Sequence, residues 1–237
     1  MTNIKNLLLG IGYRYVFGDT MEDSNPIPEI GELPIMHKFK RKAGGVALLL
    51  GKRESGKTEL AKRMAEIIGK PTYAVSPEQK PPPWITPLKM GELNHSPPAK
   101  TTLILDDLPV IMSSRDYHNP DVQIVEKLIP VVRHTRKIHL IFSTQMASMA
   151  DKFVMDADLI CFKSPNLLYA DLERPAVAKW FKQIMPIFNR MSERQQKRHC
   201  YIISQDWKGL VRINLAQNSM PSVISEEDDE EDNEKFD

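Results

Sequence analysis

The stretch that decides the fold is GKRESGKT, residues 51–58, which directly follows the apolar run Val46–Leu50. Its spacing, G-x-x-x-x-G-K-[ST], is that of a phosphate loop, whose backbone N–H groups face phosphate oxygens. We expect Lys57 to place its charge on the β- and γ-phosphates and Thr58 to supply a Mg²⁺ ligand. Apolar residues then recur with helical period as far as Ile68. Strand, loop and helix together predict a site for ATP and Mg²⁺. The residues predicted to contact the nucleotide are Gly51, Arg53, Glu54, Ser55, Gly56, Lys57, Thr58 and Glu59.

The chain of 237 residues is long enough for one domain with a sizeable core. No apolar run approaches the roughly 20 residues of a membrane span, so we expect no transmembrane segment. Cys161 and Cys200 lie in apolar surroundings without metal-ligand spacing, which favours buried thiols in a reducing compartment, the cytoplasm. The six histidines also lack mutual ligand spacing, and we predict no structural zinc.

Charge is divided unevenly along the chain. Residues 226–237 (EEDDEEDNEKFD) hold nine acids and one lysine, a net charge of −8. Because the whole chain carries +1, the other 225 residues carry +9. A basic body suggests a polyanionic partner, and the acidic tail is predicted to be disordered and able to compete with DNA for the basic surface.

Several β-branched, apolar runs separated by helical stretches predict an α/β fold with a mostly parallel central sheet. The five runs are Val46–Leu50, Thr72–Val75, Thr101–Leu105, Ile138–Ser143 and Leu159–Lys163. Amphipathic helices are expected after Asn119-Pro120 and over Asp171–Arg190. A closing hairpin is expected from Tyr201–Ser204 and Leu210–Leu215.

Two segments are predicted to lack regular structure. Residues 1–43 contain several prolines and end in a basic cluster between Lys38 and Lys42, so we expect a loosely structured N-terminal extension. Ser76–Lys100 contains seven prolines, which predicts a functional surface loop or a disordered segment. The predicted division is an extension (1–43), a P-loop ATPase domain (44–218) and an acidic tail (219–237).

A second chemical element is Thr101-Thr-Leu-Ile-Leu-Asp106-Asp107, an apolar strand that ends in two carboxylates. Asp106 is predicted to face the Mg²⁺ of the loop, and Asp107 to orient the water that attacks the γ-phosphate. The run Thr72–Val75 comes between this strand and the loop in sequence. This arrangement is typical of ring-forming, water-activating ATPases.

A third element, residues 133–145, runs from Arg133 through Arg136 into an apolar strand that ends in Thr144-Gln145. The Gln145 amide is predicted to sense the γ-phosphate or hold the attacking water. The two arginines precede the strand, at the opposite edge of the sheet from the chain's own nucleotide. One of them is predicted to act as an arginine finger on a neighbouring subunit, with Arg53 as a rival acting within the subunit.

Loop, intervening strand, Asp106-Asp107 and the R-x-x-R-x-x-H-L-I-F-S-T-Q tract of residues 133–145 together resemble the FtsK–HerA superfamily of DNA-pumping ATPases. The small single domain looks most like its viral branch, the genome-packaging ATPases of tailless double jelly-roll icosahedral viruses, poxvirus-type relatives included. The match covers about residues 44–163. Asp107 departs from the pattern, since many relatives have glutamate there.

The resemblance implies a RecA-like fold, a pentameric or hexameric ring, and ATP-driven packaging of double-stranded DNA in the host cytoplasm or the virion. A capsid vertex or a membrane protein would be the docking partner. Other functions stay open: a cellular conjugation or helicase-like translocase, a nucleoside or small-molecule kinase, and a non-motor, nucleotide-gated assembly protein. The arginine-free stretch around Pro81–Pro83 argues against a kinase lid.

Overall fold

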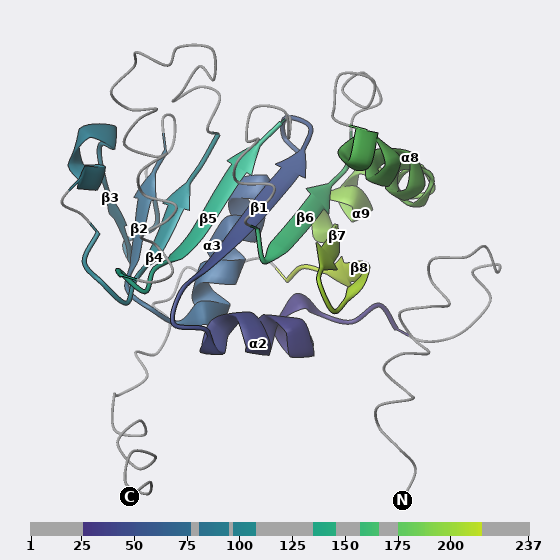
Figure 1. The fold of residues 1–237 in the computed structure, drawn as a ribbon. Coiled ribbons are helices and arrows are strands. Elements are labelled where there is room, and N and C mark those ends of the chain that lie inside the picture. Colours follow the sequence, from purple (N-terminus) through teal and green to yellow (C-terminus); the bar gives the residue numbers. More distant parts are fainter. Residues whose placement is uncertain are drawn as a thin grey trace, which may run out of the picture.

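The computed structural model describes residues 26–76, 81–94, 97–107, 135–145, 157–165 and 175–214. Within these ranges, one eight-stranded sheet runs in the order β3-β2-β4-β5-β1-β6-β7-β8 (Figure 1). Its strands are β1 (Gly45–Gly51), β2 (Thr72–Val75), β3 (Ile85–Pro87), β4 (Thr102–Leu105), β5 (His139–Thr144), β6 (Leu159–Lys163), β7 (His199–Ser204) and β8 (Lys208–Arg212).

The predicted parallel sheet is confirmed. Strand β1 pairs in parallel with β5 on one side and β6 on the other, and β4 pairs in parallel with β5 and β2. The strand that separates the loop strand β1 from the carboxylate strand β4 in space is β5. The run Thr72–Val75, which separates them in sequence, lies on the far side of β4 as β2.

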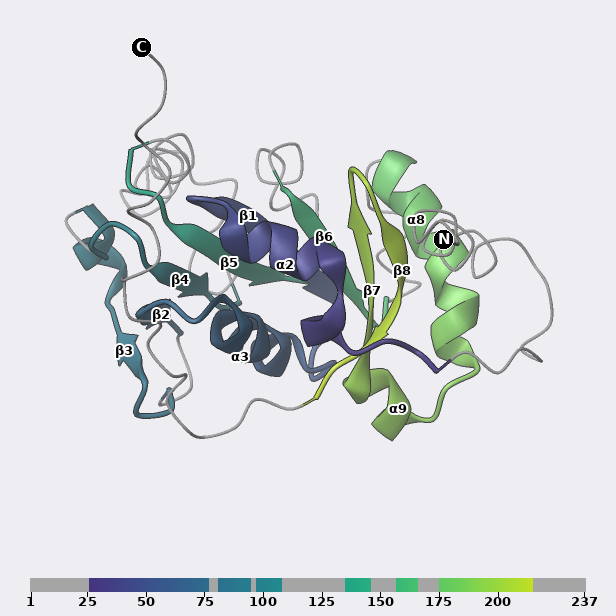
Figure 2. The same cartoon turned by 90° about the horizontal axis from the view of Figure 1, so that it is seen from below.

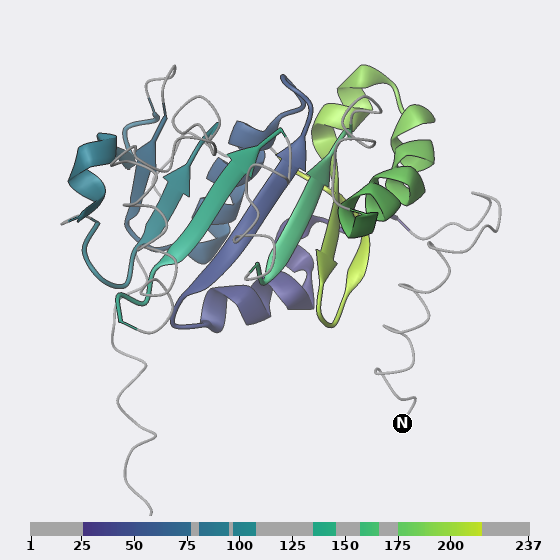
Figure 3. The same cartoon turned by 45° about the horizontal axis from the view of Figure 1, so that its top comes forward.

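Both faces of the sheet are covered, which explains why β1 is buried along its whole length. Val46, Leu48 and Leu50 belong to a core cluster that includes the buried side of α8 (Pro175–Asn189). The alternate residues Ala47 and Leu49 belong to a second cluster with α3 (Lys57–Ile68). Figure 3 shows α8 in front of the sheet and α3 behind it. A strand covered on both faces reads as a continuous apolar run rather than an alternating one.

The expectation of a loosely structured N-terminal extension is wrong for residues 26–43. A short 3₁₀ turn, η1 (Ile30–Glu32), leads into α2 (Pro34–Arg41), which has proline at its first position. Met36 and Phe39 are buried against the α3 side of the sheet, while the basic residues of the cluster face outward. Figure 2 shows α2 passing beneath β1. The basic cluster is therefore the exposed side of an amphipathic helix.

The expectation that prolines exclude regular structure from residues 76–100 is also wrong. Within this segment β3 adds a parallel edge strand to β2, and η2 (Met90–Asn94) follows it. Trp84, Ile85 and Leu93 are buried and anchor the segment to the core. Proline is tolerated at an edge strand because one side of the strand makes no ladder bonds.

The C-terminal hairpin is confirmed as β7 and β8, which pair antiparallel with each other and extend the sheet from β6. The short helix α9 (Glu193–Arg198) precedes it. The predicted helix after Asn119 and the acidic tail lie outside the described residues. None of the described helices has the length and hydropathy needed to cross a membrane.

Candidate nucleotide site

The loop between β1 and α3 has the conformation that its sequence predicts. Gly56 adopts φ +89° and caps the N-terminus of α3, and Glu54 is also left-handed, at φ 58°. A helix that begins at Lys57 directs its first free N–H groups and the positive end of its dipole toward the loop, an arrangement that binds phosphate.

Gly51 is the last residue of β1, and its role follows from the neighbouring strand. A Cβ atom on Gly51 would lie 1.9 Å from the carbonyl oxygen of Lys163 on the adjacent strand β6. Glycine is required here because β6 lies directly against the start of the loop, and not because of a positive φ.

Lys57 is the first residue of α3, directly after the loop. Its Nζ donates hydrogen bonds to the carbonyl oxygens of Gly51 (3.1 Å) and Lys52 (3.0 Å), and the residue is buried. Burial lowers the pKa of Lys57, an effect that the nearby carboxylates of Asp107 and Asp106 oppose. The ammonium is held by two neutral acceptors, which a phosphate oxygen could replace with a stronger, charged partner.

The predicted metal ligands meet directly. The Thr58 hydroxyl donates to Oδ2 of Asp106 at 2.7 Å, and the Ser143 hydroxyl donates to Oδ1 of the same carboxylate at 2.6 Å. Hydroxyl and carboxylate oxygens are the hard ligands that Mg²⁺ prefers, often together with phosphate oxygens. Thr58 and Asp106 therefore fit a Mg²⁺ ion bound along with a nucleotide.

Asp107 has a constrained backbone and a carboxylate oxygen that could accept a hydrogen bond from a ligand. Its backbone is left-handed (φ 50°), and its N–H donates to the Ser143 hydroxyl at 2.9 Å. Its Oδ1 is shielded from solvent and has no hydrogen-bond partner among the described residues. A buried carboxylate oxygen without a donor is costly, and a bound water or ligand would satisfy it.

The strand register brings the third element to the same edge. Leu105 is opposite Phe142 and Leu50 is opposite Thr144 across β5. The residues that follow these strands, Asp106 and Gln145, thus lie beside the phosphate loop, as predicted. Gln145 is partly exposed.

Of the arginines proposed as fingers, the structure describes the positions of Arg136 and Arg53, and their catalytic roles stay predictions. Arg136 precedes β5, and its carbonyl accepts a hydrogen bond from Lys100 N at 3.0 Å, before the start of β4. It therefore lies at the opposite edge of the sheet from Asp106, as expected, and its guanidinium donates to the Leu93 carbonyl at 3.4 Å. Arg133 lies outside the described residues, and Arg53 is exposed on the loop.

Two other residues of the predicted nucleotide set have partners or positions that the sequence did not indicate. Glu59 forms an ion pair with Lys62 at 2.7 Å, one helical turn along α3. Ser55 is buried, and its hydroxyl has no hydrogen-bond partner among the described residues. The Ser55 hydroxyl therefore stays available inside the loop, whereas the Glu59 carboxylate is already paired.

Sequence reasoning missed Ser143 and Lys163. Ser143 links the Asp106 carboxylate to the backbone N–H of Asp107, and the Ser-Thr-Gln ending of its strand was the available signal. Lys163 is fully buried behind the loop. A lysine that ends an apolar strand was its signal, but the sequence does not show which backbone atoms surround it.

Three features define an α/β P-loop NTPase fold. The phosphate loop joins β1 to α3, the two carboxylates directly follow β4, and β5 lies between β1 and β4 in the sheet. Among solved structures, the chain is similar to the genome packaging NTPase B204 from Sulfolobus turreted icosahedral virus 2 in complex with sulfate. The identity is 13% and the TM-score 0.49, over 74% of this chain and 100% of that one. The same protein in complex with ATP-gammaS gives 14% and 0.48, over 72% and 98%.

A second kind of structure is similar at 12% identity and a TM-score of 0.46: the cytoplasmic domain of the Thermomonospora curvata Type VII secretion ATPase EccC, over 74% of this chain and 26% of that one. No protein-family profile matches the chain, and no curated protein matches it. Solved structures of the kind that the sequence resembles are thus among its structural neighbours.

Proposed function

We propose that this protein is an ATPase that uses ATP hydrolysis to move double-stranded DNA, in the packaging of a viral genome. The observation that carries the ATPase part is the joined set of Thr58, Asp106, Ser143 and Asp107. Hydrogen bonds of 2.6 and 2.7 Å hold the Asp106 carboxylate beside the phosphate loop, and one of 2.9 Å holds the Asp107 backbone. Among the described residues, Oδ1 of Asp107 has no donor.

Each residue of this set has a chemical role in hydrolysis. The loop N–H groups and Lys57 would bind the β- and γ-phosphates, and Thr58 and Asp106 would hold Mg²⁺, which neutralises developing charge. Asp107 would accept a proton from the attacking water while the oxygen of that water bonds to Pγ. The bond from Pγ to the bridging oxygen would break, and ADP would leave. The Gln145 amide would orient that water.

The DNA part of the proposal is supported by the resemblance of residues 44–163 and by the charge of the body. A net charge of +9 outside the acidic tail suits binding to a phosphate backbone. A homo-oligomeric ring would place Arg136, or Arg133, at a neighbouring subunit's γ-phosphate, where an arginine stabilises transition-state charge. Arg136 lies at the opposite ends of the strands from the phosphate loop of its own subunit, which supports a role between subunits.

The test is ATP turnover with and without duplex DNA, together with identification of the phosphate product. We expect release of inorganic phosphate, faster when duplex DNA is present. Transfer of phosphate to a nucleoside or another small molecule would identify a kinase instead. Hydrolysis that duplex DNA leaves unchanged would favour a nucleotide-gated assembly protein without motor activity.

A further inference from the structure

A fully buried lysine lies behind the phosphate loop and takes no part in the chemistry proposed above. Lys163 ends β6, and its Nζ donates to three backbone carbonyls at the end of α9: Gln196 (3.2 Å), Lys197 (2.7 Å) and His199 (2.8 Å). The last carbonyls of a helix lack partners within the helix and favour a cation. Lys163 therefore caps the C-terminus of α9 with its buried ammonium group.

The same lysine is in contact with the loop. A Cβ on Gly51 would overlap the Lys163 carbonyl, and Lys52 N donates to the carbonyl of Ser164 at 3.3 Å. At the other end of the loop, a Cβ on Gly56 would lie 3.3 Å from the Lys197 carbonyl and 3.6 Å from Lys163 Nζ. Gly51 therefore packs on the backbone of Lys163, and Gly56 packs on its side chain and on the Lys197 carbonyl that this side chain binds.

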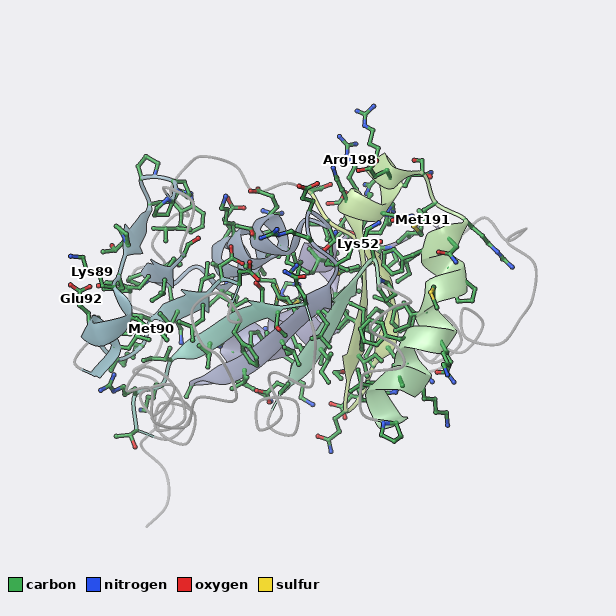
Figure 4. All side chains as sticks on the ribbon, turned by 90° about the horizontal axis from the view of Figure 1, so that it is seen from above. Lys52, Lys89, Met90, Glu92, Met191 and Arg198 are labelled. Atoms are coloured by element: carbon green, nitrogen blue, oxygen red, sulfur yellow. The ribbon has the colours of Figure 1, made fainter. Side chains whose placement is uncertain are left out.

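The contact continues into the α8–α9 connection. The Ser164 hydroxyl donates to Oε1 of Gln196 at 2.7 Å, and Nε2 of Gln196 donates to the carbonyls of Phe188 (2.9 Å) and Met191 (3.2 Å). Figure 4 shows Lys52 of the loop at the same end of the molecule as Arg198 of α9 and Met191. A chain of hydrogen bonds therefore joins the back of the loop to the end of α8.

The charge on this lysine is set by its surroundings. Burial lowers the pKa of Lys163 to about 8, and the groups that face it are the thiols of Cys200 and Cys161 and the ammonium of Lys57. An ammonium with three carbonyl acceptors has each of its protons satisfied. Loss of the side-chain amine would leave those carbonyls without this donor.

We propose that Lys163 is a positioning residue of the nucleotide site, which couples the phosphate loop to α9 and the α8–α9 connection. Binding of a nucleoside triphosphate fixes the loop, and the loop packs on Lys163, so α9 is stabilised when the phosphates are bound. Coupling of this kind is reciprocal: a change that loosens α9 weakens nucleotide binding by the same factor. This inference rests on the proposed binding of ATP at the loop.

The first experiment uses the unaltered protein. Hydrogen exchange followed by mass spectrometry is measured with and without ATPγS and Mg²⁺. We expect slower exchange in residues 51–58 and also in residues 193–199, which supply no predicted nucleotide contact. Protection of the loop with unchanged exchange in 193–199 would overturn the coupling and leave the proposed ATP site intact. Absence of ATPγS binding would overturn both.

The second experiment compares lysine-to-methionine substitutions. Lys163→Met should weaken ATPγS binding about tenfold, within the usual range of coupling between sites, and should abolish the protection of residues 193–199 at saturating nucleotide. Lys179→Met, at an exposed position of α8, removes the same charge and should change neither quantity. Equal affinity and equal protection in Lys163→Met and the unaltered protein would refute the role. If Lys163→Met does not fold, the exchange measurement on the unaltered protein still decides.

Discussion

At the scale of single residues, the site depends on how two adjacent carboxylates are given different tasks. Asp106 accepts hydrogen bonds from two hydroxyls, those of Thr58 and Ser143, so both of its oxygens are occupied. Asp107 has its backbone held by Ser143, and one of its carboxylate oxygens is buried with no donor in the part of the chain that the structure describes. A carboxylate held by hydroxyls suits a metal ligand, and a free carboxylate oxygen suits a base.

This difference predicts the effect of neutralising the second carboxylate. Asp107→Asn should retain ATP binding and lose hydrolysis by roughly a hundredfold or more, which is the scale expected when a general base is removed. Binding is measured by ATPγS titration and hydrolysis by phosphate release. Asp206→Asn, at an exposed ion pair with Lys38, is the matched control and should leave both unchanged. Near-normal turnover in Asp107→Asn, with Asp106→Asn inactive, would move the base elsewhere.

How far the sequence predicted the site is also clearest at single residues. Pattern reading identified Lys57 and Thr58 in the phosphate loop and Asp106 and Asp107 after a second apolar run, because each is part of a short pattern next to a predicted strand. It did not identify Ser143 as their link, since that link depends on the register of β4 against β5, whose residues are 37 apart in the chain. The spacing of residues within a short motif does not predict how two distant strands pair.

At the scale of the elements, the parallel strands were predictable and the covering helix α2 was not. Strands buried on both faces leave a long apolar run in the sequence, whereas α2 has only Met36 and Phe39 as buried positions in eight residues. Four cations around them gave the segment the composition of a solvated loop. Only the contact with β1 and β5 distinguishes a helix of the core from an extension.

The packing of α2 predicts that the N-terminal segment contributes to stability. Phe39 is buried, and its ring lies 5.1 Å from that of His139 on β5 in an edge-to-face contact. Phe39→Ala should lower the free energy of unfolding by about 3–5 kcal/mol, the usual cost of removing a buried aromatic ring. Urea unfolding measures this change, with the exposed His37→Ala on the same helix as control. Equal stability of the two variants would show that α2 is not part of the core.

The contact between α2 and β5 also predicts a dependence of stability on pH. His139 is buried, with Nε2 2.9 Å from the Phe39 carbonyl, and its Nδ1 has no partner among the described residues. Burial lowers the pKa of His139 to about 4 from an ordinary value of 6.5, so the folded protein keeps the ring neutral. The contribution of the neutral His139 ring to the free energy of unfolding is complete above about pH 6.5. It is lost as the pH falls toward 4, because His139 binds a proton in the unfolded chain at a higher pH than in the folded protein.

The size of this effect follows from the shift of the pKa, and amounts to roughly 3 kcal/mol over that interval. It is measured as the free energy of unfolding in urea between pH 7 and pH 4. The variant His139→Gln cannot titrate and should show a smaller loss over the same interval. Parallel pH curves for the variant and the unaltered protein would contradict the assignment.

At the scale of the whole molecule, the nucleotide site and Arg136 lie at opposite ends of the strands of the sheet. The nucleotide site lies at the carboxyl ends of β1, β4 and β5, while Arg136 lies at the opposite ends of the same strands. In a monomer this arginine would have no nucleotide to act on. In the proposed ring, the edge of one subunit would face the nucleotide of the next, and Arg136 and the phosphate loop would then be parts of one site.

A mixing experiment tests this arrangement. Arg136→Ala subunits and Lys57→Ala subunits should each be inactive alone and should regain some turnover when mixed, because some interfaces then pair an intact loop with an intact arginine. The measurement is ATP turnover in rings shown by mass to contain both variants. Absence of rescue in such rings would assign Arg136 a structural role and favour Arg53, or Arg133, as the catalytic cation.

The central claim, that hydrolysis at this loop moves duplex DNA, is tested most directly by displacement of a labelled third strand from one end of a duplex. We predict that the protein releases the third strand in ATP and Mg²⁺ but not in ATPγS, and that Lys57→Ala releases none while Lys179→Met behaves as the unaltered protein. ATP hydrolysis at a normal rate on bound duplex, with the third strand left in place, would contradict the claim.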